Sequence, residues 1–127
     1  MTARPLALVV EDSADQTALL KRYLDREGFD VFAAADAETA IAAFATISPA
    51  VTVLDLLLPG ISGTELARLI KTRFPDCFLI VSSVLDVADY PDADAALPKP
   101  IIGADLRALL REATVSYTHL RAHETRG

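Results

Sequence analysis

Short apolar segments alternate with helix-like segments along this 127-residue chain, and this alternation limits its possible folds more than any other feature. Each apolar segment has the length and the branched residues of a buried strand, whereas the intervening stretches carry apolar residues at helical spacing. The predicted strands are residues 6–10, 31–34, 51–54, 77–81 and 95–97. Because parallel neighbouring strands need crossover helices, the pattern predicts an α/β fold with a doubly wound, five-stranded parallel sheet.

Capping residues mark the starts of three predicted helices. Ser13, Asp36 and Ser62 each precede a helical segment and can accept a hydrogen bond from its first turn. A last helix is predicted over residues 104–113. The stretch 84–94, between the fourth and fifth strands, is short and contains a proline, so that the sequence predicts only a shortened fourth helix there.

Apolar residues within these elements are expected to form the core. In the second predicted helix, the residues expected to face inward are Ile41, Phe44 and Ile47. The single cysteine, Cys77, stands at the start of an apolar run with no histidine near it. We therefore interpret Cys77 as a core residue rather than a nucleophile.

Composition argues against several classes of function. With 52% apolar and 24% charged residues, the chain is typical of one globular domain. Its apolar stretches are shorter than a membrane span, and residues 1–5 lack the apolar part of a signal peptide, so that a cytoplasmic location is expected. A net charge of -6 opposes direct binding of this domain to nucleic acid or to anionic membranes.

Side chains that could bind a metal ion or a phosphoryl group follow four of the predicted strands. Glu11 and Asp12 follow the first strand, Asp55 the third, Ser82 the fourth and Lys99 the fifth. The carboxyl ends of parallel strands meet at one edge, where ligands bind in doubly wound sheets. Converging carboxylates repel one another unless they hold protons or bind a cation, and oxygen ligands alone favour Mg²⁺ as that cation. With Lys99 and Ser82 to bind phosphoryl oxygens, the set predicts phosphoryl transfer to Asp55.

Four motifs at these strand ends resemble the receiver domain of two-component response regulators, of the chemotaxis response regulator type. They are LVVED, LDLLLPGISG, LIVSS and the PKP element, within residues 6–113. The resemblance implies a flavodoxin-like strand order 2-1-3-4-5. It also implies Mg²⁺-dependent phosphorylation and dephosphorylation catalysed by the domain itself, with the phosphoryl group coming from a sensor histidine kinase or a phosphotransfer protein.

The resemblance assigns a role to each of the predicted site residues. It implies that Asp55 is the phosphoacceptor, and that Glu11, Asp12 and the backbone carbonyl of Leu57 complete the Mg²⁺ site. Ser82 would be the switch hydroxyl. Lys99 would pair with the phosphate and precede a cis peptide bond to proline.

The chain departs from the family pattern in the region of the predicted switch. Ala96 occupies the position where the family usually carries an aromatic residue. Tyr90 could replace that residue, although a tyrosine that merely packs is the simpler interpretation. Leu57 and Val84, which flank the acyl phosphate in this family, are both apolar here. We expect them to exclude the hydrolytic water and to prolong the phosphorylated state.

The end of the chain differs in character from the rest. Residues 115–125 resemble the translation of a sequencing adaptor, so that we interpret residues 1–114 as the receiver domain and residues 115–127 as a non-native tail. A native gene would then continue past residue 114, and an output domain could have been lost. His119 and His123 lie at helical spacing, but a pair of histidines without a third ligand is weak evidence for a metal site.

Three rival interpretations have different requirements. A haloacid-dehalogenase-type phosphatase needs a second acid where Leu57 stands, and a dinucleotide-binding domain needs glycines after the first strand, where Glu11, Asp12 and Ser13 stand. A receiver-like module that binds proteins without being phosphorylated fits the same fold and stays open as the alternative.

Overall fold

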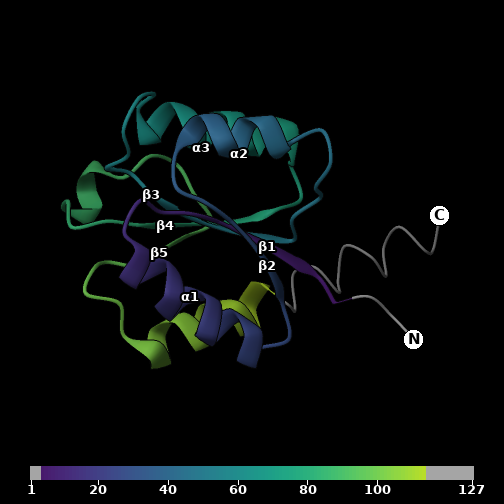
Figure 1. The fold of residues 1–127 in the computed structure, drawn as a ribbon. Coiled ribbons are helices and arrows are strands. Elements are labelled where there is room, and N and C mark those ends of the chain that lie inside the picture. Colours follow the sequence, from purple (N-terminus) through teal and green to yellow (C-terminus); the bar gives the residue numbers. More distant parts are fainter. Residues whose placement is uncertain (1–3, 114–127) are drawn as a thin grey trace.

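A computed structural model describes residues 4–113 and shows a parallel five-stranded sheet between two layers of helices (Figure 1). The strand order is β2-β1-β3-β4-β5, as the resemblance implied. The elements are β1 Leu6–Val10, α1 Ala14–Arg26, β2 Asp30–Ala34, α2 Ala37–Ala43, β3 Val51–Asp55, α3 Gly63–Arg73, β4 Phe78–Ser82, a 3-10 helix Val87–Asp89, β5 Ala95–Ala96 and a helix over residues 103–113. The predicted tail, with His119 and His123, lies outside the described residues.

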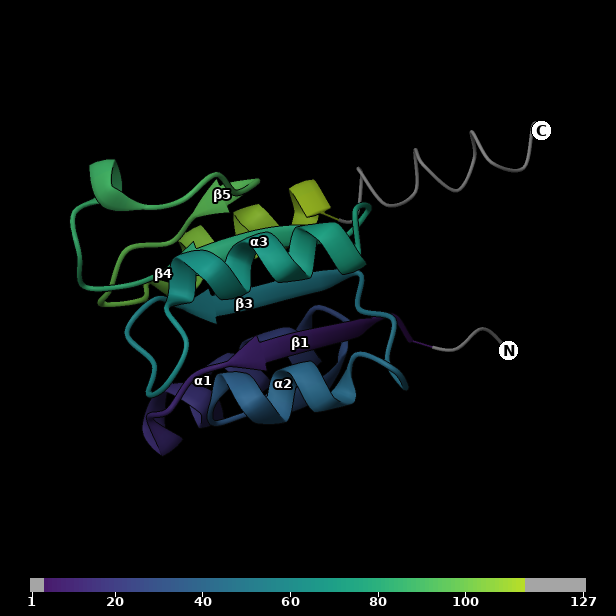
Figure 2. The same cartoon turned by 90° about the horizontal axis from the view of Figure 1, so that it is seen from above.

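The helices α2 and α3 cover one face of the sheet, and α1 and the helix over residues 103–113 cover the other (Figures 1 and 2). Alternate residues of β1 enter the two cores: Leu8 and Val10 lie under α2 and α3, while Ala7 and Val9 face the opposite layer. A strand covered on both faces must be apolar throughout, which explains why β1 stays apolar until Glu11.

Side-chain caps begin each of the three labelled helices directly after a strand or a short loop. The Ser13 hydroxyl accepts a hydrogen bond of 3.3 Å at the start of α1, the Asp36 carboxylate one of 2.7 Å at α2, and the Ser62 hydroxyl one of 3.1 Å at α3. All three predicted caps are therefore confirmed.

The prediction that Ile41 faces the core is wrong, because its side chain is 39% exposed. Helix α2 buries instead three alanines spaced three residues apart: Ala37, Ala40 and Ala43. Such small side chains let the helix lie close to the sheet, and Ile41 is left beside the contact rather than in it. Phe44 and Ile47 do pack against the core, although only partly buried.

The connection between β4 and β5 contains no α-helix, only the three-residue 3-10 helix, and this confirms the shortened fourth helix. Two contacts hold its far end. Lys71 Nζ lies 3.1 Å from Asp94 Oδ2, and the same oxygen accepts a hydrogen bond of 2.8 Å from the Leu79 N–H. None of the described helices has the length and apolar character needed to cross a membrane.

Candidate functional site

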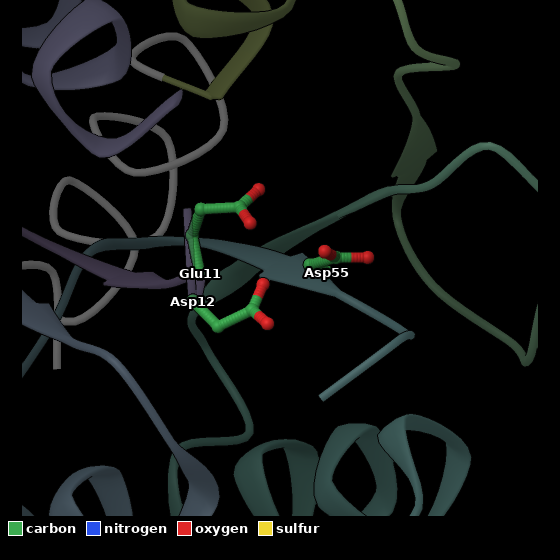
Figure 3. Close-up of side chains that lie close together, drawn as sticks. All are labelled: Glu11, Asp12 and Asp55. Carbon is green, nitrogen blue, oxygen red and sulfur yellow. The ribbon is translucent and has the colours of Figure 1, made fainter. Parts of the chain in front are cut away.

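Three carboxylates meet at the carboxyl ends of two neighbouring strands of the sheet. Glu11 and Asp12 follow β1, and Asp55 ends β3, the strand beside it. One oxygen from each of the three lies within 4.8 Å of the others, a spacing that could hold a metal ion. Figure 3 shows the carboxylates of Glu11 and Asp12 at the end of their strand with Asp55 beside them. Glu11 and Asp55 are buried, whereas Asp12 is exposed to solvent.

Lys99 lies directly against two of these acids. Its Nζ is 2.6 Å from Glu11 Oε1 and 3.1 Å from Asp55 Oδ2, and its side chain is only 13% exposed. The Lys99–Pro100 peptide bond is cis, as the resemblance implied. The ammonium group thus contacts both Glu11 and Asp55 and offsets the repulsion between them.

Burial and ion pairing shift the pKa values of Glu11 and Lys99. Burial raises the pKa of Glu11 above its ordinary value of 4.5, although the hydrogen bond from Lys99 opposes this effect. Burial also disfavours the charge of Lys99, but its hydrogen bonds to Glu11 and Asp55 outweigh burial and raise the pKa of Lys99 above 10.5. Lys99 is therefore a cation at neutral pH, as its pairing with Glu11 and Asp55 requires.

The second oxygen of Asp55 is bound by the loop that follows β3. Asp55 Oδ1 accepts a hydrogen bond of 3.0 Å from the Leu57 N–H. The Leu57 side chain is 50% exposed at this edge of the sheet. The contact fixes the orientation of the Asp55 carboxylate, with one oxygen toward Lys99 and the other toward the loop.

Ser82 lies beside Asp55 on the neighbouring strand. It ends β4, pairs in register with Asp55, and is only 2% exposed. Its Oγ has no hydrogen-bond partner among the described residues. A buried hydroxyl without a partner is energetically unfavourable and is free to donate to a group attached to its neighbour.

Two features of this region were not predicted from the sequence. The Tyr90 hydroxyl accepts a hydrogen bond of 3.1 Å from the Ser83 N–H and donates one of 2.8 Å to the Ser83 carbonyl, so that Tyr90 does more than pack. At the start of α3, a Cβ on Gly63 would come within 2.4 Å of the Leu56 backbone, which only glycine avoids. The single tyrosine in the polar stretch 84–94 was the available signal for the first feature.

Comparisons with known proteins agree on one family. A family model described as the response regulator receiver domain matches residues 7–111. The transcriptional regulatory protein TrcR of Mycobacterium tuberculosis is 37% identical over 117 residues, which covers 84% of this chain and 46% of TrcR. The DNA-binding response regulator MtrA of Mycobacterium bovis is 30% identical over 115 residues, covering 87% of this chain and 50% of MtrA. The chain thus spans about half the length of these relatives.

Solved structures with the same fold include two receiver proteins. A CheY-like receiver domain protein from Methanospirillum hungatei superposes with a TM-score of 0.83 at 24% identity, covering 91% of this chain and 98% of its own, a likeness of fold alone. The response regulator TrrA of Thermotoga maritima, solved in complex with Mg²⁺-BeF, gives a TM-score of 0.78 at 27% identity, covering 86% and 98%.

Proposed function

The chain belongs to the family of response regulator receiver domains of two-component systems, and on that premise we propose that Asp55 is its phosphoacceptor. One observation carries the proposal: Asp55 is buried, touches the Lys99 ammonium group and lies among two further acids. A carboxylate so placed has beside it the positive charge that stabilises an attached phosphoryl group.

The proposed reaction is transfer from a phosphohistidine. A carboxylate oxygen of Asp55 attacks the phosphorus, and the phosphorus–nitrogen bond breaks. The imidazole nitrogen leaves with the bonding electron pair and takes a proton from solvent, while Asp55 becomes an acyl phosphate. Lys99 pairs with a phosphoryl oxygen of this product, and the Ser82 hydroxyl donates a hydrogen bond to another.

We also propose that the metal at this site is Mg²⁺. Glu11, Asp12 and Asp55 offer oxygen ligands only, the donor set that Mg²⁺ prefers, and the backbone carbonyl of Leu57 would be a further ligand. The ion supplies positive charge that neutralises the carboxylates and the phosphoryl oxygens. The Mg²⁺-BeF complex of TrrA supports this choice.

The proposed partners follow from the family and from the length of the relatives. The phosphodonor is a sensor histidine kinase or a phosphotransfer protein. Because MtrA is a DNA-binding response regulator about twice as long as this chain, we propose that the receiver domain, residues 1–114, controls an output domain beyond it. Residues 115–127 would then replace the start of that continuation.

Intact-mass spectrometry after incubation with acetyl phosphate tests the proposal. We expect one added phosphate in the presence of Mg²⁺ and far less when the metal is chelated. Asp55→Asn should remove the addition, while Asp86→Asn, a matched change in the exposed segment after β4, should retain it. A phosphate that survives Asp55→Asn would overturn the assignment. A wild-type protein that never gains one would favour the phosphorylation-independent interaction module.

A further inference from the structure

Tyr90 connects the segment after β4 to the end of that strand. Its ring packs against the core under α2 and α3, and its hydroxyl reaches the backbone of Ser83. The hydroxyl donates to the Ser83 carbonyl at 2.8 Å and accepts from the Ser83 N–H at 3.1 Å. One side chain thus satisfies both backbone groups of a single residue seven positions earlier in the chain.

Ser83 connects the backbone of two site residues, Ser82 and Lys99. It follows Ser82 directly and is completely buried, with an exposed fraction of 0%. Its carbonyl also accepts a hydrogen bond of 3.0 Å from the Lys99 N–H. The backbone of Ser83 is therefore adjacent to the unpartnered hydroxyl on one side and bonded to the backbone of Lys99 on the other. A shift of Ser83 would move both groups relative to Asp55.

Apart from a hydrogen bond of 3.3 Å from the Leu85 N–H to the Ser83 Oγ, the connection after β4 provides few other restraints on this strand end. Val84 and Val87 are 69% and 50% exposed, and the 3-10 helix is only three residues long. The contact between Asp94 and Lys71 holds the far end of the connection, next to Leu79 rather than Ser83. Without the Tyr90 hydroxyl, the Ser83 N–H would be a buried donor that has lost its acceptor, which is unfavourable enough to loosen the strand end.

We propose that Tyr90 is a positioning residue for phosphoryl transfer, acting through Ser83 to hold the Ser82 hydroxyl and Lys99 in place around Asp55. This inference rests on the proposed function, because it assigns Tyr90 to the same reaction. Tyr90 does not touch the reacting atoms. It orders the peptide between the β4 strand end and the exposed segment 84–94, so that the segment and the site are mechanically linked.

Tyr90→Phe tests the proposal, because it keeps the packed ring and removes only the hydroxyl. The rate of phosphorylation by acetyl phosphate at saturating Mg²⁺ should fall roughly three- to tenfold, the range that one neutral hydrogen bond is worth. The Kd for Mg²⁺ should stay within about twofold, because the acids on β1 are not bonded to Tyr90. Amide exchange of Ser83, followed by NMR, should become faster than in the wild type.

Tyr23→Phe is the matched control, since Tyr23 packs in the core on the opposite face of the sheet. It should leave the rate of phosphorylation and the exchange of Ser83 unchanged. An unchanged rate in Tyr90→Phe would overturn the proposal. So would a loss of rate accompanied by an equal loss of Mg²⁺ affinity, because that pattern indicates general destabilisation. If the wild-type protein is not phosphorylated at all, the proposed function itself fails, an outcome distinct from both.

Discussion

Two regions lie at the same edge of the sheet. One is formed by the carboxyl ends of β1 and β3, the other is the segment that follows β4, and different interactions hold each of them. At the ends of β1 and β3, three acids and Lys99 form a compact charged cluster in which Glu11 and Asp55 are buried. The segment 84–94 is largely exposed, and its anchors include the contacts of Tyr90 and Leu85 with Ser83 and of Asp94 with Lys71 and Leu79. Two ion pairs to Lys99 hold the charged cluster together, whereas the segment depends on a few hydrogen bonds and one ion pair.

This difference assigns different tasks to the two regions. Buried charges are costly to separate, so that a change of charge at Asp55 must be compensated within the cluster. A segment with few buried contacts opens at low cost and can follow such a change. The comparison therefore predicts that chemistry is controlled by the cluster and that the response is carried by the segment.

The largest difference in stability is expected between variants of two lysines. Lys99 lies in the charged cluster, and Lys71 holds the far end of the segment 84–94. Lys99→Met leaves Glu11 and Asp55 buried without their cation and should lower the free energy of unfolding by about 3 kcal/mol. Lys71→Met should lower it by only about 1 kcal/mol, because that pair with Asp94 is about one-third exposed and screened by solvent.

Urea unfolding of both variants, with divalent ions chelated, measures this contrast. Added Mg²⁺ should stabilise both variants, since both keep the three carboxylates, but it should stabilise Lys99→Met more, because there the cation also takes over the role of the ammonium group. Equal losses in the two variants would show that the cluster is no more tightly coupled than the segment.

The next effect is the pH dependence of Mg²⁺ binding. Because burial raises the pKa of Glu11 above 4.5, this carboxyl keeps its proton to a higher pH than an exposed glutamate and competes with the metal. Mg²⁺ affinity should fall by up to about tenfold per pH unit below that raised pKa. Calorimetric titration with Mg²⁺ between acidic and neutral pH measures the fall.

Without metal, the raised pKa of Glu11 also makes the stability of the fold depend on pH. Stability falls as the pH rises, whereas Mg²⁺ affinity increases. A raised pKa means that the folded state favours the protonated form, so the contribution of Glu11 to the free energy of unfolding is fully present below 4.5 and is lost as the pH rises through the raised value. Glu11→Gln should flatten both dependences. A Mg²⁺ affinity with the same pH profile in Glu11→Gln would remove Glu11 from the metal site.

The smallest expected effect is on the lifetime of the acyl phosphate at Asp55. Leu57, in the loop after β3, and Val84, after β4, are 50% and 69% exposed. Replacing both with glutamine should admit water to the acyl phosphate and speed its loss about threefold, less than 1 kcal/mol in the barrier.

Release of phosphate from the purified phosphorylated protein measures this rate. Val87→Gln, which changes a similarly exposed apolar residue of the same segment, should leave it unaltered. An unchanged lifetime in the Leu57 and Val84 double variant would mean that these side chains do not restrict water.

Sequence reasoning predicted the charged cluster well because its cause is local. A strand buried on both faces must be apolar, so a carboxylate that interrupts it, as Glu11 and Asp55 do, marks the strand's end. Parallel pairing then places such ends together. The caps Ser13 and Ser62 act within one helical turn and were also visible in the pattern.

The features that sequence reasoning missed depend on how separate elements approach one another. Ile41 is exposed because three alanines bring α2 close to the sheet, a choice that helical spacing alone does not reveal. The need for Gly63 arises from the Leu56 backbone, and the contacts of Tyr90 arise from the path of a segment that contains only a three-residue 3-10 helix. Helical spacing fits Ile41 as well as it fits the alanines, and the positions of Gly63 and Tyr90 have no periodic signal.

The most direct test of the central claim is to locate the phosphoryl group on the chain. Borohydride reduces an aspartyl phosphate to homoserine, and peptide mass spectrometry then identifies the converted residue. After phosphorylation by acetyl phosphate with Mg²⁺, we predict conversion at residue 55 and at neither Glu11 nor Asp12. Conversion elsewhere, or a phosphorylated protein in which Asp55 remains intact, would contradict the account.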